Sequence, residues 1–175
     1  VTYNGSALGE RFRVRNNGGV TFNGDSADAN ALEDYEEGTY TPYFGASGNY
    51  SSGGMVLNYT TQFGAYVKIG HIVVVSISLT WNSKSGTNSN NTSDLTLSLP
   101  FNCGNGNFMG HGTIGYNNAV DFNADARGIH GASNVDIIYF DRVQTGSGKH
   151  AGYCSTQNID SSGHFRLGYT YMTTA

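Results

Sequence analysis

The feature that most constrains the fold is an alternating run of apolar and polar residues near the middle of the chain. Residues 65–81 form this run, which Gly70 interrupts. Beyond Gly70, one set of side chains is strongly apolar (Val73, Val75, Ile77, Leu79 and Trp81), while the set between them is mostly small and polar. A period of two places the apolar set on one face of an extended strand. The run therefore predicts a β-strand that buries one face.

The same period recurs in three other places along the chain. The sets are Leu95, Leu97, Leu99 and Phe101; Val135, Ile137 and Tyr139; and Phe165, Leu167, Tyr169 and Tyr171. The chain has 25 Gly, 12 Tyr and 9 Phe but only 2 Pro, a composition that suits strands and turns better than helices. Several such strands at irregular spacing predict an all-β fold, an antiparallel β-sandwich that is jelly-roll-like.

Residues 1–25 are predicted to form a separate β-hairpin. Two short alternating runs flank Asn17 and Gly18, which adopt positive φ at little cost. The apolar set of this hairpin is small, and an isolated two-stranded hairpin is only marginally stable in water. Neighbouring copies of the chain would supply the missing cover, which favours a homo-oligomer.

The remainder divides into a linker and one domain. Residues 26–42 carry an acidic cluster that ends at Gly38 and Pro42, and they are predicted to be a linker or a short helical turn. Residues 43–175 are predicted to form the sandwich. On strand faces opposite the core, four apolar side chains are expected to be exposed in a single chain and buried between subunits: Ile72, Val74, Ile138 and Phe140.

Charge and hydropathy exclude several classes of partner. The formal net charge is −4, so the basic surface that nucleic-acid binding requires is missing. The longest apolar run, Ile72–Val75, is far too short to span a bilayer, and the first residues lack the order of a signal peptide. We therefore expect no nucleic acid and no membrane insertion. Cys103 and Cys154 lack metal or redox spacing and are expected to be thiols, with one intrachain disulfide as the alternative.

No motif predicts catalysis. The five histidines are scattered without the spacing of a metal site, and no aspartate spacing singles out a glycosidase pair. We therefore expect no enzyme activity, no metal ligands and no cofactor, although an axial metal site in a trimer remains open.

Three pieces of the first hundred residues resemble a known family. They are Ala31–Pro42, Gln62–Gly70 and Leu99–Phe101, and residues 10–20 upstream read like a repeated shaft hairpin. This order resembles the C-terminal region of phage tail fibre proteins, notably those of marine and cyanobacterial phages. One position departs from the family, because Tyr40 stands where Trp is usual; both rings pack with one edge in water, so the fold should survive.

The resemblance implies a trimeric tip domain at the end of a fibre shaft, located in the virion. Residues 43–175 would then be the receptor-binding domain of an adhesin whose partner is a glycan such as lipopolysaccharide, or an outer-membrane receptor. The alternative is a structural cap that promotes trimerisation or folding and binds no receptor.

The candidate receptor contacts are rings in or beside long polar stretches at 82–94, 102–118 and 144–163. Loops of that length often carry function, and an exposed ring offers a sugar a flat apolar surface. The six candidates are Trp81, Phe108, His111, Tyr116, His130 and Tyr153. Packing in the core or the trimer interface is the alternative for each ring, and it is favoured for Trp81 and Tyr116.

Overall fold

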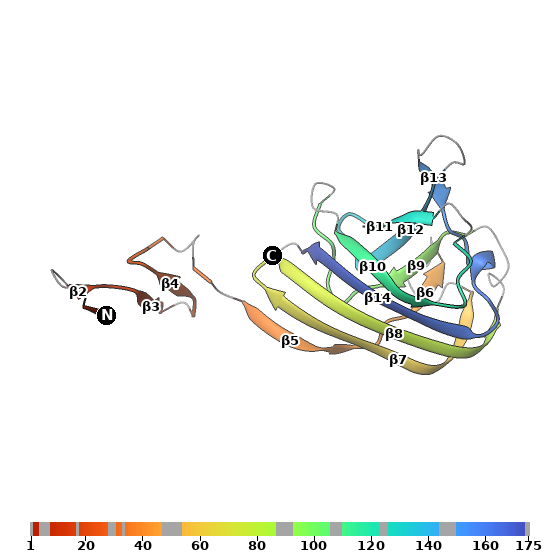
Figure 1. Ribbon diagram of the computed structural model, residues 1–175, viewed down its shortest axis with the longest axis horizontal. Coiled ribbons are helices and arrows are strands. Elements are labelled where there is room, and N and C mark those ends of the chain that lie inside the picture. Colours follow the sequence, from red (N-terminus) through yellow and green to blue (C-terminus); the bar gives the residue numbers. More distant parts are fainter. Residues whose placement is uncertain are drawn as a thin grey trace.

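The computed structural model describes residues 2–3, 8–16, 18–27, 31–32, 34–46, 54–86, 93–105, 110–122, 126–143 and 150–173. Within these ranges the regular structure is β-strand, apart from one 3-10 turn, η2 (Thr156–Asn158). Two antiparallel sheets face each other (Figure 1). The prediction of an all-β antiparallel sandwich is confirmed.

The first sheet has five long strands in the order β10 (His111–Asn117), β14 (Gly163–Met172), β8 (Ile72–Ser85), β7 (Val56–Ile69) and β5 (Tyr35–Tyr40). The second has the order β11 (Ala126–Gly131), β12 (Ile137–Val143), β9 (Leu95–Ser98) and β6 (Phe44–Ala46), and β13 (His150–Tyr153) also pairs with β12. The C-terminal strand β14 thus lies between β8 and β10, which joins the two ends of the domain sequence in one sheet.

The core lies between the two sheets and is rich in rings. Phe44 from β6 is central: its ring centroid lies 5.8 Å from Trp81, 5.2 Å from Phe165 and 6.1 Å from Phe140. Each of these side chains is at most 2% exposed. Aromatic side chains bury large areas, so this cluster supplies much of the apolar burial that holds the sheets together.

Alternation predicted the faces of β8 correctly and those of β12 incorrectly. Val73 and Val75 are buried while Ile72 and Val74 are about half exposed, as expected. In β12 the expected Ile137 is buried, but Ile138 and Phe140 are buried too and belong to the core cluster, while Tyr139 is only half-buried. The prediction that Ile138 and Phe140 are exposed is therefore wrong. Residues 137–140 are all apolar or aromatic, so the pattern contains no polar face to set the parity.

The acidic segment contains a strand where a linker or helical turn was expected. Residues 35–40 form β5, which pairs with β7 from Tyr35↔Ile69 to Tyr40↔Gly64. Strand β7 offers backbone hydrogen bonds to this segment, and these outweigh the modest helical preference of its glutamates. The sandwich consequently begins near residue 35 rather than at 43.

The three pieces that carry the family resemblance meet at one end of the sandwich. Tyr66 lies opposite Gly38, and Tyr40 lies opposite Gly64, so each ring covers a glycine on the neighbouring strand. The Tyr66 ring also packs edge-on against Phe101, with centroids 5.0 Å apart. These contacts give the pieces a structural role, because they set the register of β5 on β7.

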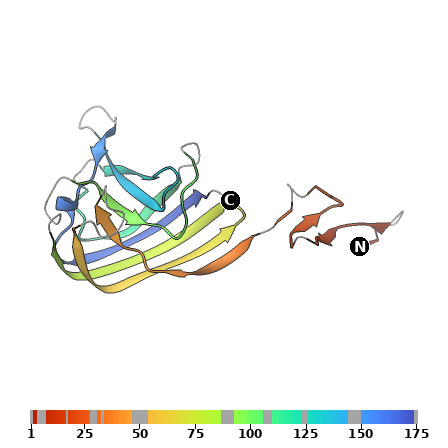
Figure 2. The same cartoon turned by 180° about the vertical axis from the view of Figure 1, so that it is seen from behind.

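The predicted N-terminal hairpin is confirmed, and its apolar side chains are exposed. Strands β3 (Phe12–Val14) and β4 (Val20–Phe22) pair antiparallel, while β1 (Thr2–Tyr3) pairs with β2 (Leu8–Gly9). Both pairs lie to one side of the sandwich (Figure 2). Phe12, Val14 and Phe22 are 51 to 66% exposed. These apolar side chains lack the cover that a stable hairpin needs.

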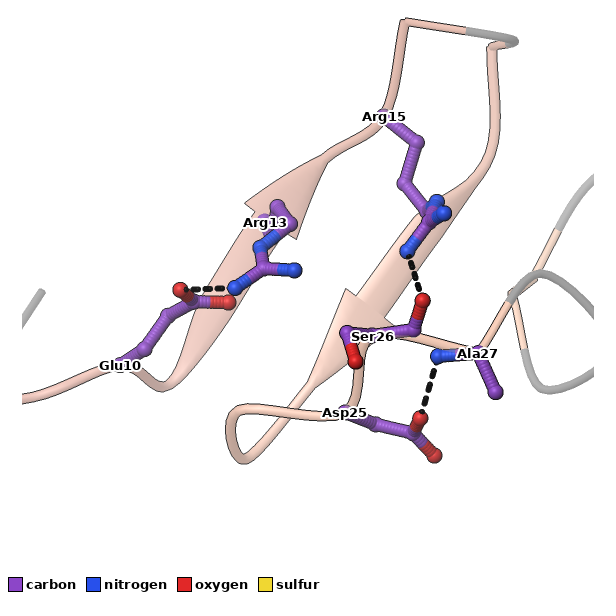
Figure 3. Close-up of polar contacts among 6 residues, drawn as sticks. All are labelled: Glu10, Arg13, Arg15, Asp25, Ser26 and Ala27. Atoms are coloured by element: carbon purple, nitrogen blue, oxygen red, sulfur yellow. Dashed lines mark hydrogen bonds and ion pairs between the residues drawn. The ribbon is translucent and has the colours of Figure 1, made fainter.

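Polar contacts hold this hairpin in place of a core. Arg13 pairs with Glu10 at 2.7 Å, and Arg15 donates to the backbone carbonyl of Ser26 at 2.6 Å (Figure 3). The backbone N–H of Ala27 donates to the Asp25 carboxylate at 2.9 Å. Exposed ion pairs contribute little free energy. These polar contacts therefore do not replace the apolar burial that the hairpin lacks.

Candidate functional site

The six predicted contact residues fall into three groups. Trp81 lies in the core, where its indole N–H donates to the backbone carbonyl of Asp160 at 3.1 Å, so its prediction as a receptor contact is wrong for this fold. Phe108 lies outside the described residues. The remaining four lie on strands rather than on loops: His111 and Tyr116 on β10, His130 on β11 and Tyr153 on β13.

The polar stretches predicted as loops are therefore partly strand. Hydrogen bonding to β14 orders β10, with His111 opposite Thr170 and Asn117 opposite Phe165. β8 likewise runs on to Ser85, into the first of these stretches. Glycine- and asparagine-rich segments have low strand preference, but ladder partners override it in a sheet.

Two of the predicted residues come together with a third ring on the outer face of the second sheet. Tyr139 and Tyr153 stack with centroids 4.5 Å apart and planes inclined by 23°. His130 lies 5.7 Å from Tyr139 and 5.4 Å from Tyr153. We call these three residues and Asp141 the ring cluster. All four side chains are half-buried, so each keeps part of its surface in contact with solvent.

Strand register explains why these residues meet. His130 lies directly opposite Tyr139 in the β11–β12 ladder, and Asp141 lies opposite Tyr153 in the β12–β13 ladder. Because alternate residues of β12 share a face, Tyr139 and Asp141 both point outward while Phe140 points into the core. Tyr139 was not among the predicted contacts, because alternation places it in one apolar set with Val135 and Ile137.

A carboxylate orients the imidazole of the cluster. His130 Nδ1 lies 2.9 Å from Asp141 Oδ2. A methyl group added at Gly128, opposite Asp141, would lie 2.7 Å from that oxygen, so glycine leaves room for the carboxylate. Among the described residues, His130 hydrogen-bonds to Asp141. Within the same residues it forms no hydrogen bond to the side chain of a Ser or Cys that could act as a nucleophile. The arrangement suits directional hydrogen bonding to a ligand beside a flat apolar surface.

A second pair of rings lies on the outer face of the other sheet. Tyr116 packs against His164 with centroids 5.0 Å apart, and Arg166 donates from Nε to His164 Nε2 at 3.1 Å. His111 is exposed on the same strand as Tyr116 but shares none of these contacts. The four described candidates therefore do not form one site.

A separate open pocket of about 360 Å³ lies where β6 meets the start of β7. Its lining is uncharged: Thr41, Tyr43, Phe44, Val56, Leu57, Tyr59 and Gln62. The Tyr59 hydroxyl accepts a hydrogen bond from the Phe44 backbone N–H at 2.8 Å, and burial raises the pKa of Tyr59 to about 12. A neutral phenol held in this way serves packing rather than proton transfer.

The cysteines offer no reactive site. Cys103 and Cys154 are both buried and form no disulfide with each other. Burial raises the pKa of Cys103 to about 12, which keeps it a neutral thiol at physiological pH. Within the described residues, no group of three or more His, Cys, Asp or Glu side chains is placed to hold a metal ion. In the same residues, no helix is long and apolar enough to cross a membrane.

The resemblance to phage tail fibres rests on residues 10–101 of this sequence, and the ring cluster lies beyond them. Neither a family model, nor a curated protein, nor a solved structure matches this chain.

Proposed function

We propose that this chain is the trimeric tip of a bacteriophage tail fibre, an adhesin of the virion that binds a cell-surface glycan such as lipopolysaccharide. The observation that carries the proposal is the ring cluster on the outer face of β11, β12 and β13. It combines stacked tyrosines with an oriented imidazole and a carboxylate. These are the groups that bind the apolar face and the hydroxyls of a sugar.

Adhesion through such a weak site requires several copies of the site to bind at once. A shallow surface that contacts one or two sugar rings binds weakly, because little area is buried and many hydroxyls must be desolvated. Three copies on one tip, and several fibres on one virion, raise the effective concentration at the second and later contacts. Weak individual sites then give stable adsorption without any catalytic step.

Exposed apolar surface at the shaft end of the sandwich supports the homotrimer. On the outer face of the first sheet, Tyr35, Ile69 and Ile72 form neighbouring cross-strand pairs and are 43 to 64% exposed. They lie at the end of the sheet that joins the N-terminal segment, whose hairpin is also uncovered (Figure 1). Contact with neighbouring chains would bury both regions at once.

Light scattering checks the assembly. At micromolar concentration the chain is expected to show a mass near three times 18.7 kDa. Ile72→Asp should shift it toward the monomer, since the carboxylate would be desolvated in the interface. A mass of 18.7 kDa for the parent chain would contradict the trimer.

Glycan binding tests the adhesin. On arrays of bacterial lipopolysaccharides and capsular polysaccharides, Tyr139→Ala and Tyr153→Ala should each weaken binding by up to about tenfold per site, the effect expected of one aromatic contact. Val56→Ala is the control, because it removes a half-exposed apolar side chain from the other sheet, away from the cluster and from the hairpin.

The second candidate function is a structural cap that binds no receptor. It is favoured by the contacts among the three family-like pieces, which set the register of β5 on β7. Parent-like binding by both tyrosine variants, with unchanged mass and melting temperature, would remove the ring cluster from the adhesin. Absence of binding by the parent to every glycan and to host cells would favour the cap.

A further inference from the structure

A single arginine lies between two exposed rings on the outer face of the first sheet. Arg166 of β14 pairs with Tyr116 on β10 and with Ser78 on β8, and Ser78 in turn lies opposite Phe63 on β7. Directly opposed residues share a face, so these four side chains form one row across the sheet. Tyr116 is 47% and Phe63 is 51% exposed. We call this row, together with His164, the arginine row.

A bulge places Tyr116 in this row. The ladder between β10 and β14 shifts register between Ile114 and Tyr116, so that Gly115 is the extra residue. Such a bulge re-aims the side chains that follow it. Ile114 packs against the core, whereas Tyr116 reaches the His164 ring on the outer face.

The guanidinium of Arg166 is oriented but not neutralised. Its Nε donates a hydrogen bond to His164 Nε2 at 3.1 Å, which fixes the direction of the guanidinium plane. Arg166 enters none of the ion pairs that the described residues form. Held by Nε, it keeps the N–H groups of both Nη atoms for a ligand. Such a planar fork matches a carboxylate in bidentate geometry.

We infer that the arginine row binds the carboxylate of an acidic sugar, a uronic acid residue of a surface polysaccharide, with the sugar ring lying on Tyr116. Ser78 and Thr80, the cross-strand neighbours of Arg166 and His164, offer hydroxyls to the sugar. A single positive charge matches a monoanionic carboxylate better than a doubly charged phosphate. The inference rests on the proposed adhesin function and adds a ligand class to it.

The two surfaces differ in the sugar that they favour. The ring cluster contains the Asp141 carboxylate, which repels an anionic sugar, whereas the arginine row attracts one. They lie on the outer faces of different sheets, so each can be altered without touching the other. The arginine row crosses β8 at Ser78, four residues along the strand from Val74 and farther from the apolar shaft end.

Titration of this 175-residue chain with trigalacturonate tests the inference, with neutral galactotriose and galactose 1-phosphate as parallel probes. Trigalacturonate should bind more tightly than galactotriose, and raised salt should weaken it. Arg166→Gln should reduce trigalacturonate binding about tenfold or more, and Arg166→Lys should give an intermediate loss, because the charge stays but the fork is lost. Arg11→Gln makes the same charge change at an exposed arginine of the hairpin and should bind as the parent does.

The outcomes separate the two sites. Unchanged trigalacturonate binding in a stable Arg166→Gln trimer would overturn the inference, and tighter binding of galactose 1-phosphate than of trigalacturonate would overturn the assignment of a carboxylate. Tyr153→Ala should leave trigalacturonate binding intact. Loss of binding in Tyr153→Ala but not in Arg166→Gln would leave the adhesin standing and remove the arginine row from it.

Discussion

Replacement of Trp81 with Ala should lower the free energy of unfolding by about 3–5 kcal/mol, the range for loss of a large buried ring. Trp81 is 2% exposed, and its ring meets Phe44 edge-on at 5.8 Å. Removing it leaves a cavity between the sheets and deprives the Asp160 carbonyl of its donor. Denaturant unfolding at a fixed chain concentration measures the loss.

Trp81→Phe separates the two parts of that effect. It keeps a ring against Phe44 but removes the indole N–H, so its cost should be smaller than that of the alanine variant. A Trp81→Ala chain that melts as the parent does but fails to bind glycan would contradict the placement of this residue in the core. It would restore Trp81 as a receptor contact.

Replacement of Gly64 with Ala should lower the free energy of unfolding by about 1–3 kcal/mol, the typical cost of overpacking. A methyl group at this position would lie 2.3 Å from Cε1 of Tyr40, the ring that covers the glycine from β5. Tyr40 is held in turn by its contact with the Ser98 carbonyl at 3.4 Å and by packing on the core. Thermal unfolding of the variant and the parent measures the effect.

The chain provides a matched control for Gly64→Ala. Gly168 on β14 is also within the first sheet, but a methyl group there would have no atom within 4 Å. Gly168→Ala should therefore leave stability unchanged or slightly raised, since alanine restricts the unfolded chain. In Tyr40→Ala the clash is relieved, so adding Gly64→Ala should cost much less than it does in the parent. Equal costs in both backgrounds would contradict the ring-over-glycine contact.

These contacts give the family-like pieces a physical meaning that their order along the chain does not reveal. Gly38 and Gly64 are needed because a tyrosine from the opposite strand lies over each of them. Lys68, beyond this pair, forms an ion pair with Asp34 and lies 5.9 Å from the Phe101 ring. The pieces thus serve the joint between the acidic segment and the sandwich, which is consistent with a role in assembly rather than in receptor contact.

The sequence by itself determined the fold class and the faces of strands with one polar side. In β8 and β14 a large apolar set alternates with small or polar residues. Burying the polar set would remove it from water at a cost in free energy, so only the apolar face can enter the core. The hairpin at residues 12–22 was equally predictable, because its turn chemistry and its alternation are both local.

Only the tertiary structure decided the parity of β12, the strand in the acidic segment and the make-up of the candidate sites. β12 begins with four hydrophobic or aromatic residues, 137–140, so its sequence has no polar face. Pairing of β12 with β9 and β11 therefore determines which of these side chains enter the core. β5 forms because the edge of β7 offers hydrogen bonds to it. His130, Tyr139 and Tyr153 come from three strands and meet through ladder register, a long-range property that no local pattern of residues encodes.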